Sequence, residues 1–213
     1  MKIPISLKLK KKLHQDIAYA QDLVVEEVYR VFDRAVLHGG TAIWRCYQGS
    51  RFSEDIDAYI EKNEEKINLL FDSLSRRGLE IVRKKISENS IYSLLRLGRT
   101  ETRFEAVFKK IKNYLLKSYE TCEGNLINVF TLSPEDLIQE KIDAYLKRRK
   151  IRDLYDIFFL LNYAEKEKVK KSILRLLSQF IEPEDKSTLK DLIIVGSVPS
   201  AKEIFEEIKR WAK

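Results

Sequence analysis

The chain has 213 residues, which suits one large domain or two small ones, and its 44% hydrophobic content is enough for a core. Gly and Pro number only 7 and 4, which argues against a disordered or linker-rich chain. The formal net charge of +7 favours polyanionic partners such as nucleic acid or nucleotide phosphates, although many basic proteins bind neither.

The two cysteines, Cys46 and Cys122, form neither a CxxC pair nor a zinc motif, and we expect buried free thiols. The sequence shows no recognisable signal peptide and no apolar run of about 18 residues. We therefore expect a cytoplasmic protein with no membrane association.

Helical and strand patterns alternate in the first half of the chain. Apolar residues at helical spacing predict a helix over residues 9–32, and a short apolar run predicts a strand at 35–37. A short helix is predicted at 41–47 and an amphipathic helix at 62–76, which Gly78 ends. Alternation and apolar runs predict strands at 56–60, 79–85, 91–97, 103–108 and 128–132.

The composition changes at residues 133–136, where serine, proline and two acids form a helix start. From there to the last residue the pattern is helical. We expect an α+β fold with a mixed β-sheet and flanking helices over residues 1–132, followed by a helical bundle over residues 133–213. One continuous helix over 135–152 would place Lys141, Arg148 and Arg152 on one stripe.

A glycine pair and a threonine, Gly39, Gly40 and Thr41, stand between a predicted strand and a predicted helix. The free amides at a helix start bind phosphate, and glycine lets the backbone approach it closely. This segment therefore predicts a triphosphate site, with the Thr41 hydroxyl as an added donor. Arg51 and Ser53 follow as further nucleotide-binding candidates.

Paired carboxylates follow at Asp55 and Asp57, two positions apart on a predicted strand, so both project from one face. Carboxylate oxygens are the ligands that Mg²⁺ or Mn²⁺ prefers, and two carboxylates can bridge two ions. Glu105, in mid-strand, is the candidate for a third metal ligand, and Glu101 is a weaker one. The two aspartates alone are also compatible with a solvated strand edge.

Basic residues of the helical half could neutralise phosphate or could form a solvated face. Asp153 could act as a general base, could orient Lys141, or could form an ion pair with Arg149 or Arg152. Arg51 could contact phosphate or could pair with the two aspartates nearby.

Two sets of residues in this chain resemble one known family. The first is Leu37, His38, Gly39, Gly40, Thr41, Ala42 and Ile43, with Tyr47, Gly49, Arg51, Ser53, Asp55, Ile56 and Asp57. The second is Leu132, Ser133, Pro134, Glu135, Asp136 and Leu137, with Lys141, Ala144, Arg148, Arg152, Asp153, Tyr155, Asp156, Phe159, Leu160 and Leu161. Together they resemble the AbiEii family of nucleotidyltransferase toxins, in the DNA polymerase β-like superfamily.

The resemblance implies a nucleotidyltransferase-like fold and a metal-dependent enzyme that uses an NTP and Mg²⁺. It also implies a toxin of a toxin–antitoxin or abortive-infection system, with a possible cognate antitoxin and the 3′ end of tRNA as acceptor. By motif, Asp55 and Asp57 would be metal ligands, Gly40 and Thr41 triphosphate contacts, and Lys141 and Asp153 functional residues of the helical half. Glu105 does not match a family motif and depends on strand phase alone.

Two other functions are compatible with parts of the sequence. The first is an NTP- or RNA-binding module without transferase activity, which would have no chemical need for paired carboxylates at Asp55 and Asp57. The second is a nucleic-acid-binding antitoxin, for which the sequence offers no helix-turn-helix signature.

Overall fold

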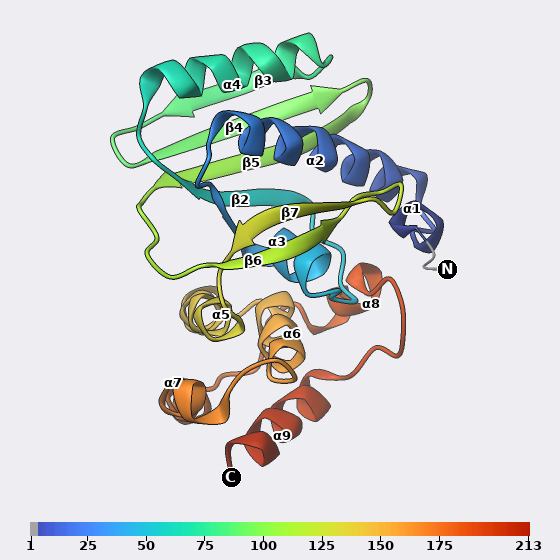
Figure 1. Cartoon of the computed structure of the whole chain (residues 1–213). Coiled ribbons are helices and arrows are strands. Elements are labelled where there is room, and N and C mark those ends of the chain that lie inside the picture. Colours follow the sequence, from blue (N-terminus) through green and yellow to red (C-terminus); the bar gives the residue numbers. More distant parts are fainter. Residues whose placement is uncertain (1–3) are drawn as a thin grey trace. The chain divides into compact units, whose positions relative to one another are not determined.

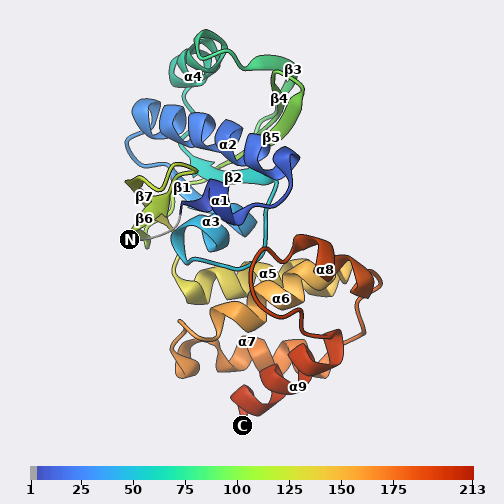
Figure 2. The same ribbon diagram turned by 90° about the vertical axis from the view of Figure 1, so that its right-hand side faces the viewer.

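A computed structural model describes residues 4–213 of the chain, shown in Figures 1 and 2. The described chain forms two compact units. The first runs to Gln48 and resumes over Phe52–Thr131, and the second consists of Gly49–Arg51 and Leu132–Lys213. We call them the sheet unit and the helical unit.

The sheet unit contains seven strands in the spatial order β3-β4-β5-β2-β1-β7-β6. Two pairs, β1 with β7 and β2 with β5, are parallel, and the other pairs are antiparallel, so the sheet is mixed. The strands are β1 (Val36–His38), β2 (Asp55–Ile60), β3 (Glu80–Ile86), β4 (Ser90–Leu97), β5 (Thr100–Phe108), β6 (Leu115–Glu120) and β7 (Leu126–Thr131). The helices are α1 (Ile5–Lys8), α2 (Lys12–Val31), α3 (Gly39–Cys46) and α4 (Glu64–Arg76).

Helix α2 packs on β2 and β5, α3 packs on β1, β2 and β6, and α4 packs on α2 and β3. Burial alternates along β2, where Ile56, Ala58 and Ile60 are buried beneath these helices. The intervening residues Asp55 and Asp57 are half-buried on the opposite face, which we call the open face. The alternation of side chains along β2 thus directs apolar residues into the core and the two aspartates to the open face.

A buried arginine fixes α3 in this layer. Arg45 of α3 is 1% exposed and lies 3.1 Å from the carboxylate of Asp22 in α2. It also donates a hydrogen bond of 2.9 Å to the backbone oxygen of Glu120 at the end of β6. A buried guanidinium that is paired and hydrogen-bonded is tolerated, and here it joins α2, α3 and β6.

The helical unit contains α5 (Pro134–Arg148), α6 (Ile151–Leu160), α7 (Lys166–Ser178), a short 3₁₀ turn η1 (Lys186–Thr188), α8 (Leu189–Leu192) and α9 (Ala201–Ala212). The predicted start of α5 is confirmed, since the Ser133 side chain accepts a hydrogen bond from the amide of Asp136. The single continuous helix considered over 135–152 does not form, so Lys141 and Arg148 lie in α5 whereas Arg152 lies in α6. Arg149 adopts a left-handed conformation with φ of 51°, which ends α5 at Arg148. The next helix, α6, begins at Ile151.

The predicted α+β class is confirmed, with a mixed sheet and flanking helices followed by a helical bundle. Strand β6 and helix α1 were not predicted. Cys46 and Cys122 are buried free thiols, as expected. Among the described helices, none combines the length and the apolar character needed to cross a bilayer.

Candidate active site

Gly39 begins α3 directly after β1, with a positive φ of 71°. A Cβ atom added to Gly39 would lie 2.3 Å from Oδ2 of Asp57, closer than side chains pack. Glycine is therefore required both by the backbone conformation and by the carboxylate beside it. The first amides of α3 lack partners within the helix, so an anion-binding helix start and a carboxylate lie side by side.

Thr41 is fully buried in the first turns of α3, next to the buried Gly40, and its hydroxyl donates a hydrogen bond to the backbone oxygen of Asp55. Gln21 of α2 donates to Oγ1 of Thr41 at 3.4 Å and to the backbone oxygen of Ser53 at 2.8 Å. These bonds hold the start of β2 against α3. A direct contact of Thr41 or Ser53 with a triphosphate stays a prediction.

Parallel pairing of β2 with β5 gathers charged side chains on the open face. The register places Arg103 beside Asp55 and Glu105 beside Asp57. Glu105 therefore shares a face with both aspartates. Its role as a metal ligand stays a prediction.

Arg103 is the cation of this carboxylate group. Its Nε lies 3.0 Å from Oδ1 of Asp55 and its Nη2 lies 2.9 Å from Oδ2, a bidentate pair. Its Nη1 is 3.5 Å from Oε1 of Glu105. Burial alone would lower the pKa of Arg103, but the charges of Asp55 and Glu105 outweigh it and raise that pKa.

The residues on the open face offer the oxygen donors that a hard divalent cation prefers. Burial, and next the negative charge of Asp57, raises the pKa of Glu105 although Arg103 opposes the shift. The carboxylates therefore repel one another, and a bound cation would relieve that repulsion. Among residues 4–213, no three acidic, histidine or cysteine side chains already converge as a metal site, and Arg103 holds both carboxylate oxygens of Asp55.

A buried ion network lies in the helical unit. Arg51 forms a bidentate pair with Asp156, with both N···O distances at 2.8 Å, and Lys141 lies 2.8 Å from the same carboxylate. Burial would raise the pKa of Asp156, but the charges of Arg51 and Lys141 outweigh it and lower that pKa. The alternative that Arg51 pairs with the aspartates near it in sequence is wrong, because its partner is 105 positions away.

Asp153 completes the network. It is fully buried and forms a bidentate pair with Arg148, with both distances at 2.7 Å, and Lys141 is 3.6 Å away. The predicted partners Arg149 and Arg152 are therefore wrong. Arg152 is half-buried in the first turn of α6 and forms no ion pair with another described residue. A role for Asp153 as general base stays a prediction.

The sequence reasoning missed two residues that organise these sites. Arg103 was named only as part of a strand pattern, yet strand phase places it on the same face as Glu105, two positions away. Gln21 looked like an ordinary polar residue of a helix, and nothing local distinguishes it. Asp156 belonged to the matched motif without an assigned partner.

Comparison with known proteins gives a consistent identification. The chain matches the family model described as "Nucleotidyl transferase AbiEii toxin, Type IV TA system" over residues 26–197. JHP933 from Helicobacter pylori is 19% identical, with a TM-score of 0.64 over 95% of this chain and 91% of that protein. MenT4, a nucleotidyltransferase toxin from Mycobacterium tuberculosis H37Rv, is 16% identical, with a TM-score of 0.66 over 98% and 90%. A search of curated proteins found no significant match.

Proposed function

The chain belongs to the AbiEii family of nucleotidyltransferase toxins, and we propose that it moves a nucleoside monophosphate from an NTP to an RNA acceptor in a metal-dependent reaction. The observation that carries this proposal is the close approach of Gly39 to Asp57, where a Cβ would lie 2.3 Å from the carboxylate. It supports the proposal because the amides at the start of α3, which would bind phosphate, lie beside a carboxylate that would ligate a metal ion, as an Mg²⁺·triphosphate complex requires.

The sheet unit supplies the parts for both halves of that complex. The amides of Gly39 and Gly40 would hold the β- and γ-phosphates, and Asp55 and Asp57 would ligate Mg²⁺ or Mn²⁺, with Glu105 as a third ligand. A metal ion held by these carboxylates would supply Lewis-acid stabilisation of the attacking oxygen and of the pyrophosphate charge.

The reaction we propose forms one bond and breaks one. The 3′ hydroxyl oxygen of the acceptor attacks the α-phosphorus, and the bond from that phosphorus to the bridging oxygen of pyrophosphate breaks. The hydroxyl proton passes to solvent water. The sequence predicts Asp153 as a general base for this step. The burial of Asp153 and its pairs with Arg148 and Lys141 suit a positioning role better than proton transfer.

Asp55 must release Arg103 before both of its oxygens can ligate a cation. We propose that Arg103 acts as an internal counter-ion that holds the carboxylates in place when no metal is bound. The freed guanidinium is then a donor of the geometry that phosphate oxygens accept.

In the helical unit, Arg148 is our first candidate for a nucleotide contact. Its side chain is 43% exposed, and the bidentate pair with the buried Asp153 fixes the orientation of its guanidinium. Lys141 and Arg51, which are 9% and 5% exposed, support the network that positions it. Arg152 stays a further candidate.

The acceptor that we propose is RNA, with the 3′ end of tRNA as the first candidate. The formal net charge of +7 supports a polyanionic acceptor. The family description as part of a type IV toxin–antitoxin system implies a cognate antitoxin.

The proposal can be tested by incubating the protein with labelled NTPs, Mg²⁺ and total tRNA. We expect label in the RNA with the natural chain, and none with Asp57→Asn. Asp72→Asn, which removes an exposed charge from α4 of the same unit, is the matched control and should keep activity. If the protein binds nucleotide but transfers no label with any common NTP and several RNAs, the proposed reaction is refuted and the chain is a binding module.

A further inference from the structure

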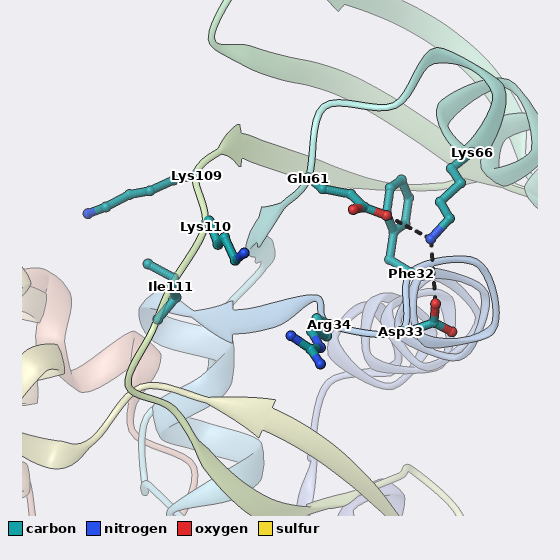
Figure 3. A pocket seen from close by; sticks show the side chains of 8 residues that line it. All are labelled: Phe32, Asp33, Arg34, Glu61, Lys66, Lys109, Lys110 and Ile111. Atoms are coloured by element: carbon teal, nitrogen blue, oxygen red, sulfur yellow. Dashed lines mark hydrogen bonds and ion pairs between the residues drawn. The ribbon is translucent and has the colours of Figure 1, made fainter.

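A basic cleft opens at the other end of the strands that carry the carboxylates. It has a volume of about 330 Å³ and is lined by Phe32, Asp33, Arg34, Glu61, Lys66, Lys109, Lys110 and Ile111 (Figure 3). Arg34 precedes β1, while Glu61 and Lys109 follow β2 and β5. Because β2 and β5 are parallel, their carboxyl ends meet at this edge, whereas Asp55 begins β2 at the opposite edge.

The acidic residues of the cleft have ion-pair partners, whereas some of its basic residues have none among the described residues. Lys66 binds both carboxylates, with its Nζ 2.7 Å from Glu61 and 3.5 Å from Asp33 (Figure 3). Arg34 and Lys110 are exposed and form no ion pair with another described residue. The lining thus carries two more positive than negative charges, and its acids are already neutralised by Lys66.

Lys109 connects the cleft to the open face of the sheet. Its ammonium lies 5.1 Å from the ring centre of Tyr59, which shares the face of Asp55 and Asp57. Tyr59 is itself stacked on His38, with ring centres 4.0 Å apart and planes 9° apart. A cation at the cleft is therefore directed toward the face that carries the candidate active site.

We propose that Arg34, Lys109 and Lys110 bind the phosphodiester backbone of the RNA acceptor, several nucleotides away from its reacting end. The cleft offers cationic donors and no exposed aromatic ring among its lining residues, which suits contact with phosphates rather than bases. This inference rests on the proposed function for the identity of the RNA, while the binding itself requires no transfer.

The geometry of the strand sets the spacing. Between Asp57 and Glu61 the chain advances along β2 by about 13 Å at the usual strand rise. Successive phosphates of one stacked strand are about 3.4 Å apart along the axis, so the cleft would meet phosphates about four nucleotides from the acceptor end. An RNA of about three nucleotides would not reach it.

The test measures the binding of fluorescently labelled total tRNA to the full chain at several salt concentrations. The double variant Lys109→Ala/Lys110→Ala should bind more weakly and reduce the slope of log affinity against log salt by about two, one per phosphate contact. Arg34→Ala should reduce it by about one. Neither variant should change transfer to an RNA of about three nucleotides.

The matched control is Lys84→Ala/Lys85→Ala on the edge strand β3. It also removes two adjacent exposed lysines, one of which lies 4.7 Å from the ring centre of Phe71. An equal loss in this control would show diffuse attraction and overturn the proposal. Unchanged salt slopes in the cleft variants, or no tRNA binding by the natural chain, would also overturn the proposal. The same holds if the cleft variants lose binding of inorganic triphosphate while they keep tRNA binding. Absence of transfer alone would refute the proposed function and leave the binding comparison valid.

Discussion

Replacement of Arg103 by alanine should tighten the binding of a divalent cation in the absence of nucleotide. In the structure both oxygens of Asp55 accept hydrogen bonds from Arg103, at 3.0 and 2.9 Å. A cation that uses these oxygens must compete with the guanidinium. Arg103→Ala removes the competitor and leaves every carboxylate in place.

The expected size of the effect follows from the exposure and geometry of the pair. The side chains of Arg103 and Asp55 are 40% and 25% exposed, so solvent screens the pair, and its bidentate geometry places it near the upper limit of about 1 kcal/mol for such pairs. The repulsion between the guanidinium and a bound divalent ion adds about 2 kcal/mol at a separation near 4 Å in water, because the ion carries two charges. Together these terms amount to about 2–3 kcal/mol and predict cation binding that is about 30-fold to 150-fold tighter.

The measurement is a titration with Mn²⁺, in which electron paramagnetic resonance reports the free ion. Arg175→Ala in the helical unit is the control, because Arg175 is also 40% exposed and pairs with the carboxylate of Asp143. It should leave Mn²⁺ affinity unchanged. Equal or weaker binding in Arg103→Ala would refute the competition and would mean that Arg103 holds the carboxylates in a binding geometry.

Three further substitutions test the positions of the fold that support the sites. Gly39→Ala places a Cβ against the Asp57 carboxylate at positive φ, so it should abolish transfer and cost at least about 1 kcal/mol of unfolding free energy in urea. Thr41→Val removes the bond to the Asp55 backbone and should cost about 1–3 kcal/mol, a loss that Thr41→Ser should partly avoid. Asp156→Asn leaves Arg51 buried without its carboxylate and should cost about 3–5 kcal/mol at neutral pH. The pKa of Asp156 is lowered on folding, so its contribution to stability is present above the ordinary pKa of an aspartate and is lost as pH falls through the lowered value. The free energy of urea unfolding of the natural chain should therefore fall on acidification. The Asp156→Asn variant should lack that part of the fall.

Local patterns predicted most of the sheet unit because its strands and helices have clear periodicity. Strand phase also placed Glu105 on the face of Asp55 and Asp57, which parallel pairing of β2 with β5 then brought together. Strand β6 was missed because it is an edge strand, with four of its six residues exposed or half-buried, and shows no regular alternation.

The rest could not be predicted because it depends on contacts between residues far apart in sequence. The break after α5 occurs at Arg149, which adopts a left-handed conformation without the glycine that usually marks a helix end. The partner of Arg51 is Asp156, and no local spacing connects them. The pairing of Arg103 with Asp55 likewise depends on strand register, which the sequence alone does not specify.

The most direct measurement compares two labels on the same nucleotide. The protein would be incubated with total tRNA and Mg²⁺, once with an NTP labelled at the α-phosphate and once at the γ-phosphate. Nucleotidyl transfer predicts that the α-label enters the RNA and the γ-label leaves with pyrophosphate, and that Asp57→Asn abolishes both events. Entry of the γ-label into RNA would instead mean phosphoryl transfer, and that result would contradict the proposed chemistry of Gly39, Asp55 and Asp57.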